Sequence, residues 1–326
     1  MSSSTPPEYI ERIKAGLGNC LTETDFDFGS KYVGKTRDTY TLDDKLILIT
    51  TDRHTSFDRR LTDVPFKGQV LNQTSAWWFE QTKGIVPNHV VSVPDPNVTV
   101  GLKCTTIPVE FVVRDYITGS TGTAIWTHYQ KGVRDFCGNK LPDGLVKNKK
   151  LPETIVTPST KDESDESISG QEAVRRGLLS EDDWEETREA VLKLFARGRE
   201  LAAKRGLILV DTKYELGRDA TGQLRVIDEM HTPDSSRYWV AATYEQRFAA
   251  GEEPEYFDKE FLRLWFAENS DPYNDVTLPP APEELVIELA RRYIQLFETI
   301  TGTKFSFPDE NQPIDERILA NLKAAV

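Results

Sequence analysis

The segment LILVDTKYELGRDATGQLRVIDEM, residues 207–230, contains two β-rich runs separated by a turn. Branched and aromatic residues are frequent in Leu207–Leu216 and Leu224–Met230, whereas Asp, Thr and Gly residues in Gly217–Gln223 supply the chemistry of a turn. We therefore predict a β-hairpin. Strands come early in the chain and long helices come later, with few β-α-β alternations, so the sequence favours an α+β fold over a doubly wound α/β fold.

One face of this hairpin is rich in charge. Side chains alternate across a strand, so Asp211, Lys213 and Glu215 share a face. Asp228 lies on the partner run, close enough to be a cross-strand neighbour. Carboxylates beside a lysine suit Mg²⁺ and a nucleotide phosphate, because Mg²⁺ takes hard oxygen ligands and often binds substrate phosphates. A solvated face with surface ion pairs has the same pattern. The hairpin alone leaves both interpretations open.

The composition limits the classes of partner. A chain of 326 residues is long enough for two lobes, and 38% hydrophobic residues provide a sizeable core. The net charge of −13 disfavours nucleic acid and membrane partners, because an acidic surface repels phosphate backbones and anionic lipid. Three scattered cysteines and four separated histidines indicate neither a disulfide framework nor a zinc site. Without a signal-peptide pattern or a long apolar stretch, we expect a cytoplasmic protein.

Several further elements are predicted from periodicity and turn chemistry. Lys31–Leu42 and Lys45–Thr51 flank Asp43-Asp44 and predict another hairpin. Three prolines and many polar residues between Cys137 and Ser169 favour long surface loops. The remaining predictions are a helix at Leu71–Phe79, an irregular edge strand or loop at Val90–Val100, a buried strand at Pro108–Val113, a helix from the Ser180 cap to about Lys204, and a helix from about Pro282 to Gly302.

A glycine-lysine pair in the first of these runs suits phosphate. Gly34-Lys35 lies within Lys31–Leu42, with Arg37 expected on the same face as Lys35. Glycine permits close backbone approach and lysine places a compact positive charge, so the pair suits a cap over a triphosphate. The segment lacks both G-x-x-x-x-G-K-[ST] and G-x-G-x-x-G, and a structural glycine within a strand explains it as well.

Other polar segments follow predicted strands. Arg114–Gly122 offers an arginine, hydroxyls and two glycines, which suit a phosphate monoester because a glycine-rich turn aims N–H groups at an anion. Thr232–Arg237 adds a second guanidinium and two serines. Ordinary turns and a helix N-cap explain both segments as well. Thr51–Asp58 and Thr157–Ser169 either close over substrate or are solvated loops, and we assign His54 no role.

Six collinear segments together resemble one family, the SAICAR synthetases. Ile107–Ser120 resembles that family's P-x-E-x-x-x-R-x-x-x-T-G-S element, and Leu209–Gly217 resembles its D-x-K-x-E-x-G element. GKTRDTY, TDRHTSFD, TPSTK and VIDEMHTPDSSRYW add further matches, so the likeness runs from about Tyr32 to Trp239. A single match of this kind would be weak support for a family, whereas six matches in the same order are not plausibly a coincidence.

The resemblance implies a reaction. ATP, L-aspartate and the carboxylated aminoimidazole ribotide (CAIR) would give the succinocarboxamide SAICAR, ADP and phosphate. The implied route is phosphorylation of the CAIR carboxylate, followed by attack of the aspartate amine on the acyl phosphate. Phosphoryl transfer depends on positioning and charge neutralisation, which fits a sequence without a candidate catalytic triad. ATP and Mg²⁺ are the expected cofactors, CAIR and L-aspartate are the expected partners, and a monomer or small homo-oligomer is the expected assembly.

The resemblance also implies site residues, position by position. The expected ATP-binding residues are Gly34, Lys35, Arg37, Glu110, Val112, Lys213 and Glu215. The expected catalytic residues are Lys35, Lys213 and Asp228, and the expected Mg²⁺ ligands are Glu215 and Asp228. The expected CAIR contacts are Arg114, Ser120, Ser235 and Arg237. Looser candidates for substrate or aspartate contacts are Asp52, Arg53, Ser56, Lys161 and Asp165.

The sequence departs from the family pattern on the side of the second substrate. Asp165–Ser169 resembles H-D-E-N-I-S, but Ser164 precedes the aspartate and Ser167 replaces the amide. His54-Thr55 stands where the family often shows a small apolar residue and serine. The aspartate contacts are therefore the least defined part of the implied site.

The implied architecture is kinase-like, with ATP in a cleft between two lobes. A small antiparallel-sheet nucleotide lobe would span residues 1–113, and a larger mixed α+β lobe would span residues 114–326. Two alternatives remain open at this point: an ATP-dependent small-molecule kinase and a non-catalytic nucleotide-binding module. A kinase needs no amine acceptor, so dependence of ADP formation on L-aspartate separates the ligase from the kinase, and a binding module gives no turnover.

Overall fold

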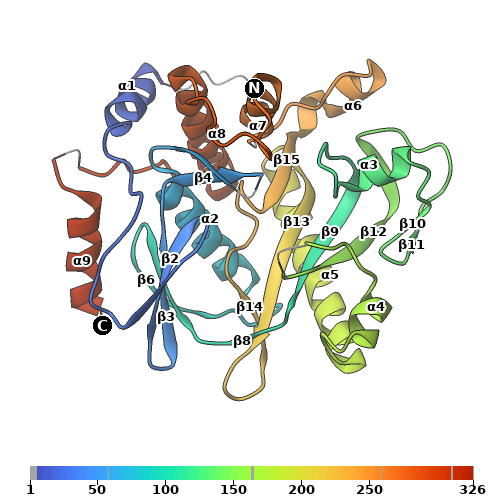
Figure 1. Ribbon diagram of the computed structural model, residues 1–326, viewed down its shortest axis with the longest axis horizontal. Helices are drawn as coiled ribbons and strands as arrows, with labels where there is room; N and C mark the ends of the chain where they lie inside the picture. Colours follow the sequence, from blue (N-terminus) through green and yellow to red (C-terminus); the bar gives the residue numbers. More distant parts are fainter. Residues whose placement is uncertain (1–5, 58, 163–164, 258, 310, 326) are drawn as a thin grey trace.

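The computed structural model describes residues 6–57, 59–162, 165–257, 259–309 and 311–325. Asp58 and Ser164, which belong to predicted polar clusters, lie outside the described residues. The fold is α+β, as the sequence predicts, with two main antiparallel sheets and helices around them (Figure 1). The sheets are joined by backbone hydrogen bonds, because Val226 N donates to Pro87 O at 3.0 Å and His89 N donates to Val226 O at 3.1 Å.

The smaller sheet comes from the N-terminal third of the chain. Its order is β1-β2-β3-β7-β6. The strands are β1 (Ser30–Val33), β2 (Arg37–Leu42), β3 (Lys45–Thr50), β6 (Val90–Asp95) and β7 (Val98–Leu102). The predicted hairpin at Asp43-Asp44 is confirmed, since β2 and β3 pair antiparallel up to Leu42 and Lys45.

The first run of this hairpin is not one strand, and this corrects the prediction. The chain reverses at residues 34–36, and β1 pairs back on β2. Lys35 therefore lies in a turn and does not share a strand face with Arg37. Gly34 is compatible with such a reversal because a Cβ there would lie 3.0 Å from Arg37 O, closer than most side chains tolerate.

The larger sheet carries the predicted 207–230 hairpin. Its path is β12-β9-β13-β14, and β8 and β15 also pair with β13. The strands are β8 (Thr105–Thr106), β9 (Val109–Ile117), β12 (Lys149–Thr160), β13 (Leu207–Arg218), β14 (Leu224–Ile227) and β15 (Ser236–Val240). The hairpin is confirmed, with Glu215 opposite Ile227, but its second strand is shorter than predicted and ends at Ile227, so Asp228 follows the strand. The predicted buried strand is confirmed as β9, which places Arg114 opposite Asp211.

Two stretches that the sequence predicts as irregular contain regular strands. Cys137–Ser169 includes β12, a strand of 12 residues at the end of the sheet path. An end strand tolerates Pro152 and Pro158 because the backbone groups along its outer edge need no hydrogen-bond partner in a neighbouring strand. Its pairing with β9 also contains a register shift. Val90–Val100 includes the irregular edge strand β6, but also the inner strand β7.

Helices cover the sheets, and the two predicted with caps are confirmed. They are α1 (Pro7–Gly16), α2 (Lys67–Thr82), α3 (Ile125–Gln130), α4 (Gly170–Arg175), α5 (Glu181–Lys204), α6 (Ala241–Ala249), α7 (Glu260–Asn269), α8 (Glu283–Thr301) and α9 (Ile314–Ala325). Ser180 Oγ caps α5 by accepting from Asp183 N at 3.0 Å, and Gly302 ends α8 with φ 73°.

Two short ladders pair β4 (Arg53–Ser56) with β5 (Arg59–Asp63), and β10 (Asp135–Phe136) with β11 (Asn139–Lys140). No helix in the described part of the chain combines the length and apolar character that a membrane crossing needs.

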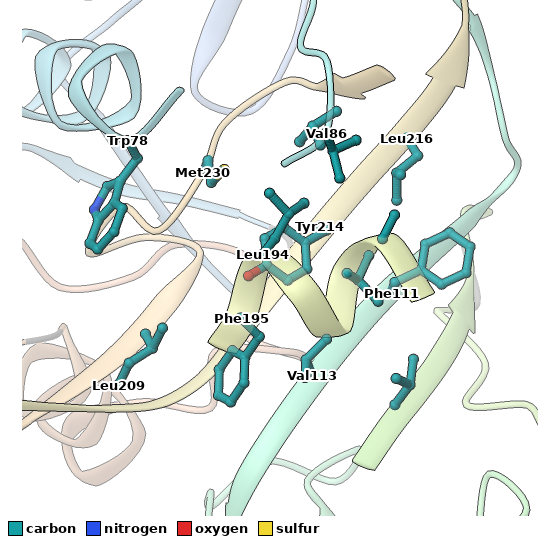
Figure 2. Packing of buried hydrophobic residues seen from close by; sticks show 14 of the residues in the cluster. Trp78, Val86, Phe111, Val113, Leu194, Phe195, Leu209, Tyr214, Leu216 and Met230 are labelled. Carbon is teal, nitrogen blue, oxygen red and sulfur yellow. The ribbon is translucent and has the colours of Figure 1, made fainter. Parts of the chain in front are cut away.

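The largest hydrophobic core lies between α5 and the larger sheet (Figure 2). Phe111 of β9, Tyr214 of β13 and Phe195 of α5 are fully buried there. Because side chains alternate along a strand, burial of Tyr214 on this face places Lys213 and Glu215 on the opposite face. The core thus fixes the direction in which the charged residues of β13 point.

Candidate active site

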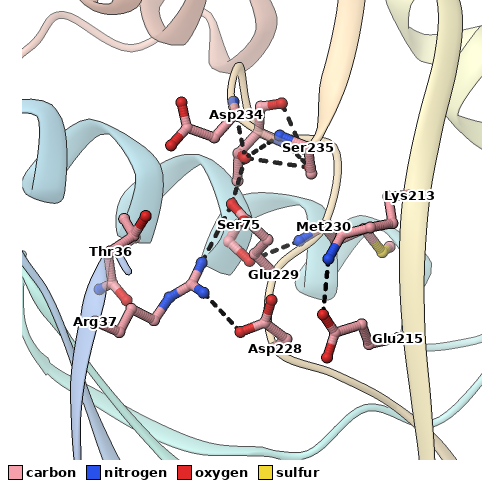
Figure 3. A network of polar contacts seen from close by, with 12 residues as sticks. Thr36, Arg37, Ser75, Lys213, Glu215, Asp228, Glu229, Met230, Asp234 and Ser235 are labelled. Atoms are coloured by element: carbon pink, nitrogen blue, oxygen red, sulfur yellow. Dashed lines mark hydrogen bonds and ion pairs between the residues drawn. The ribbon is translucent and has the colours of Figure 1, made fainter. Parts of the chain in front are cut away.

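Four charged side chains gather beside β13, and we call them the charged cluster. They are Arg37 of β2, Lys213 and Glu215 of β13, and Asp228, which directly follows β14 (Figure 3). Arg37 Nη1 lies 2.6 Å from Asp228 Oδ1, and Lys213 Nζ lies 2.8 Å from Glu215 Oε1. The sequence predicts all four as site residues, and the fold brings them together from the two sheets.

Glu215 lies between two ammonium groups. Lys161 binds its second oxygen, and Lys213 Nζ also donates to Glu110 Oε1 at 2.7 Å. Burial alone would raise the pKa of Glu215, but the positive charges of Lys213 and Lys161 lower it to about 2. The carboxylates of Glu215 and Glu110 raise the pKa of Lys213, against the effect of burial. Val112 of β9 lies opposite Lys213 in the sheet.

Asp228 has a backbone conformation that is uncommon for a residue with a side chain. Its φ is 66°, in the left-handed region. Burial raises the pKa of Asp228, the charge of Arg37 opposes this shift, and the charge of Glu215 adds to it. Unusual backbone conformations of this kind are typical of functional sites, where surrounding contacts hold them.

Glu215 and Asp228 suit a magnesium ion whose remaining ligands come from phosphate and water. Within the described residues, no group of three or more His, Cys, Asp or Glu side chains is arranged to hold a metal by itself. One or two carboxylates beside a nucleotide are the common protein share of a Mg²⁺ site. Arg37 and Lys161 already neutralise the two carboxylates, so a bound ion would compete with these side chains.

A second group of charges lies further along β9 and β13. Arg114 Nη1 and Arg237 Nη1 both donate to Asp211 Oδ2, at 3.1 and 2.7 Å. Arg114 Nε also donates to Thr157 Oγ1 at 3.0 Å. Burial lowers the pKa of Arg114, and Asp211 opposes this shift. A single carboxylate therefore orients two guanidinium groups.

A pocket of about 170 Å³ opens beside Arg237. Ser235 and Arg237 line it from the segment around β15, and Lys259 and Arg263 line it from the N-terminal end of α7. Three carboxylates, those of Asp211, Asp234 and Glu260, also line the pocket and pair with its three cations. An anionic ligand would compete with these carboxylates for the cations. Ser120 lies at the rim, because its Oγ donates to Glu260, which also lines the pocket.

The looser candidates do not gather in one place. Both carboxylate oxygens of Asp52 accept backbone N–H groups, from Leu21 at 2.7 Å and Gly68 at 2.8 Å, and burial raises the pKa of Asp52 to about 6. Arg53 binds the loop at residues 34–36. Ser56 is half-buried at the end of β4 and Asp165 is exposed, whereas Lys161 lies beside the charged cluster.

Comparison with known proteins supplies the family. A SAICAR synthetase family model matches residues 30–280. Phosphoribosylaminoimidazole-succinocarboxamide synthase from Legionella pneumophila (strain Paris) is 58% identical over 305 residues, which cover 93% of this chain and 98% of that protein.

The chain belongs to the SAICAR synthetase family.

Solved structures agree with this assignment. The SAICAR-synthase from Saccharomyces cerevisiae, complexed with SAICAR, is 34% identical with a TM-score of 0.76, covering 88% of this chain and 99% of that chain. A SAICAR synthetase (Type-2) in complex with ADP is 28% identical with a TM-score of 0.65, covering 85% and 100%. Like its relatives, this SAICAR synthetase is a carbon–nitrogen ligase of purine biosynthesis.

The fold of this SAICAR synthetase adds pocket residues that sequence reasoning missed. Lys259 and Arg263 are distant in sequence from every predicted site segment, yet α7 brings them opposite Arg237. Asp234 also lines the pocket and is held by Lys67, whose fully buried Nζ lies 2.7 Å from Asp234 Oδ2. One signal was available, because a lysine and an arginine four residues apart share one face of a helix.

Proposed function

We propose that this ligase joins L-aspartate to the carboxylate of CAIR, with conversion of ATP to ADP and phosphate, and that the ATP phosphates and Mg²⁺ bind at the charged cluster. The observation that carries this proposal is the convergence of Lys213 and Glu215 of β13 with Asp228, which directly follows β14. An ammonium beside two carboxylates suits a metal-bound triphosphate. The ADP in a solved relative supports a nucleotide at this fold.

The chain's own residues position and neutralise the reacting groups. Lys35 and Lys213 neutralise the phosphates, and Glu215 and Asp228 would hold Mg²⁺, which supplies further charge neutralisation. A CAIR carboxylate oxygen attacks the γ-phosphorus, the bond to the bridging oxygen breaks, and ADP leaves. The aspartate amine then attacks the acyl carbon, phosphate leaves, and the nitrogen loses a proton as the amide forms.

We expect CAIR to bind in the pocket beside Arg237. CAIR carries a phosphate and a carboxylate, and the pocket is lined by Arg237, Lys259 and Arg263. Asp211 binds both Arg114 and Arg237, and this shared partner supports a contact of Arg114 with the same ligand. Ser120 and Ser235 offer hydroxyls at the pocket's edge. Asp52, Ser56, Lys161 and Asp165 stay weaker candidates for the aspartate side.

The lobes are part of the same proposal. A nucleotide lobe around the smaller sheet and a second lobe around the larger sheet would hold ATP between them, with a chain boundary near Val113. The C-terminal helices return to the smaller sheet, since Ile314 and Ile318 of α9 pack in one cluster with Ile47 of β3. The first lobe therefore includes residues from both ends of the chain. A cytoplasmic location and a monomer or small homo-oligomer stay predictions.

A coupled assay of ADP release tests the reaction. The full mixture contains ATP, Mg²⁺, CAIR and L-aspartate, and each of the last two is omitted in turn. We expect steady ADP release only in the full mixture, with SAICAR formed in equal amount. Undiminished ADP release without L-aspartate would indicate a small-molecule kinase, and ATP binding without turnover in any mixture would indicate a binding module.

A further inference from the structure

Three successive carbonyl groups of the loop at residues 34–36 are held on its inner side. Arg53 Nη2 donates to Gly34 O at 2.9 Å, and Arg53 Nε donates to Lys35 O at 3.3 Å. Thr51 donates to Thr36 O twice, through its backbone N at 2.9 Å and its Oγ1 at 2.7 Å. Thr51 and Arg53 are both buried, so these donors lie in the protein interior, between the end of β3 and the start of β4.

The direction of the carbonyls fixes the direction of the amides. A trans peptide unit is planar, and its C=O and N–H bonds point in opposite directions. With Gly34 O and Lys35 O turned toward Arg53, the N–H groups of Lys35 and Thr36 point to the other side of the loop. Successive N–H groups that point in one direction form a concave surface for anions. The side chain of Lys35 belongs to the same turn.

Arg53 is itself held rigidly. Its Nη2 donates to Asp38 Oδ1 at 2.8 Å, and Asp38 is fully buried. Asp38 Oδ2 accepts from the backbone N and the hydroxyl of Thr24, at 2.8 and 2.9 Å. Arg53 Nη1 donates to Thr22 O at 2.6 Å. The guanidinium thus joins the 34–36 loop to a segment at residues 22–24, which precedes the part of the chain that the family model matches.

We propose that Arg53 is a positioning residue for ATP. It contacts no substrate: it holds the carbonyls of Gly34 and Lys35 inward, so that the loop presents N–H groups and the Lys35 ammonium to the nucleotide phosphates. This role replaces the direct substrate contact that the family resemblance implies for Arg53. The inference rests on the proposed placement of the ATP phosphates beside the 34–36 loop.

The test is Arg53→Lys, assayed with each substrate varied in turn. Lysine keeps the positive charge, but one ammonium cannot reproduce the planar fork that binds Thr22 O, Gly34 O, Lys35 O and Asp38 together. We expect the KM for ATP to rise about ten-fold, the size of one or two charge-assisted hydrogen bonds. The KM for CAIR should stay within about two-fold, because residues 34–36 do not line the pocket proposed for CAIR. A merely structural role would lower the active fraction and leave the three KM values in their original ratio.

Two further variants distinguish an error in the proposed placement of ATP from an error in the proposed role of Arg53. Arg60→Lys is the matched control, since Arg60 lies on β5 and pairs with Asp63 instead of the loop; its kinetics should match the unmodified chain. Lys35→Met tests the proposed placement of ATP. If Lys35→Met leaves the KM for ATP unchanged, that placement is wrong. If Lys35→Met raises this KM and Arg53→Lys does not, only the positioning role of Arg53 is overturned.

Thr51→Val tests whether the inward-held carbonyls of the 34–36 loop matter for nucleotide binding, if Arg53→Lys does not fold. Valine keeps the volume of Thr51 and its backbone N–H, but it removes the hydroxyl bond to Thr36 O. We expect a rise of about three-fold in the KM for ATP and a similar weakening of MgADP binding in calorimetry, as for one neutral hydrogen bond. An unchanged MgADP affinity, with Lys35→Met weakened, would overturn the proposal without any turnover measurement.

Discussion

Arg37 of β2 and Asp228 after β14 form an ion pair between the two sheets, with Nη1 2.6 Å from Oδ1. Arg37 Nη2 also lies 3.2 Å from Glu229 Oε2. Burial alone would lower the pKa of Arg37, but these carboxylates raise it, so the guanidinium is charged. A protein cation therefore occupies one of the carboxylates at which we propose Mg²⁺. Binding of the metal and nucleotide requires Arg37 to exchange partners, from carboxylate to phosphate.

Asp228→Asn should abolish turnover while the fold stays intact. The substitution keeps the side-chain volume but removes one charged ligand of the proposed Mg²⁺ site, so we expect kcat to fall by at least about 100-fold. Steady-state ADP release measures the effect, and circular dichroism checks the fold. The control is Asp143→Asn, because the side chain of Asp143 is 92% exposed and pairs only with Arg134 among the described residues. Near-normal activity of the Asp228 variant would remove the metal assignment.

Arg37→Met should strengthen metal binding in the absence of nucleotide. Methionine fills a similar volume but leaves Asp228 and Glu229 without their cation, so a divalent ion no longer competes with a guanidinium. Titration with Mn²⁺ alone, followed by electron paramagnetic resonance of the free ion, measures the affinity. We expect a gain of about ten-fold, which corresponds to about 1.4 kcal/mol.

The control for this titration removes an arginine elsewhere on the same hairpin. Arg225→Met breaks the pair with Asp219, whose Oδ2 lies 2.6 Å from Arg225 Nε, and Arg225 lies on β14 before Asp228 without being paired to it in the described residues. Its Mn²⁺ affinity should equal that of the unmodified chain. An affinity in Arg37→Met that is equal or weaker would show that Arg37 and the metal do not share Asp228.

Local signals explain which parts of the fold were predictable. The Ser180 cap and Gly302 mark helix ends through contacts within a few residues, and alternation alone places Lys213 and Glu215 on one face of β13. β12 was missed because its prolines and polar residues read as a loop. Only its partner β9, distant in sequence, makes it a strand.

The candidate site was also predictable only where the signal lies within a short stretch of sequence. Alternation in the 207–230 hairpin grouped Lys213 and Glu215 near Asp228 but left a solvated face equally open, and only the family resemblance implied roles for these residues and Arg37. The contacts of Arg53 were not predictable, because Thr22, Gly34 and Asp38 become its neighbours only after β1, β2 and β4 have assembled. Lys259 reaches the pocket through the packing of α7, which no local pattern specifies.

Arg114→Ala should raise the KM for CAIR far more than the KM for ATP. Arg114 shares Asp211 with Arg237 beside the pocket, and loss of one charge-assisted contact to an anion weakens binding by about 10- to 100-fold. Initial rates with each substrate varied measure the split. Arg199→Ala is the control, because Arg199 pairs with Asp115, the next residue of β9, on the other face of the sheet. Equal effects of Arg114→Ala on both KM values would contradict its placement near CAIR.

Glu215→Gln should lose stability in a pH-dependent way. Lys213 and Lys161 hold the pKa of Glu215 at about 2 in the folded chain, against the effect of burial and below its ordinary value of 4.5. Between these values the unfolded chain binds more protons, so the stability that Glu215 contributes is present above pH 4.5 and is lost as the pH falls toward 2. Glutamine cannot ionise and lacks this contribution.

We therefore expect the unmodified chain to be more stable than Glu215→Gln by about 2 kcal/mol at pH 7, the order of a partly compensated buried pair. Urea denaturation at intervals from pH 7 to pH 3 should show this difference shrinking only below about pH 4.5. Glu189→Gln, which removes an exposed partner of Lys193 on α5, should follow the unmodified chain throughout. A difference between Glu215→Gln and the unmodified chain that is constant over this range would mean that packing, and not the charge held between the two lysines, determines the effect.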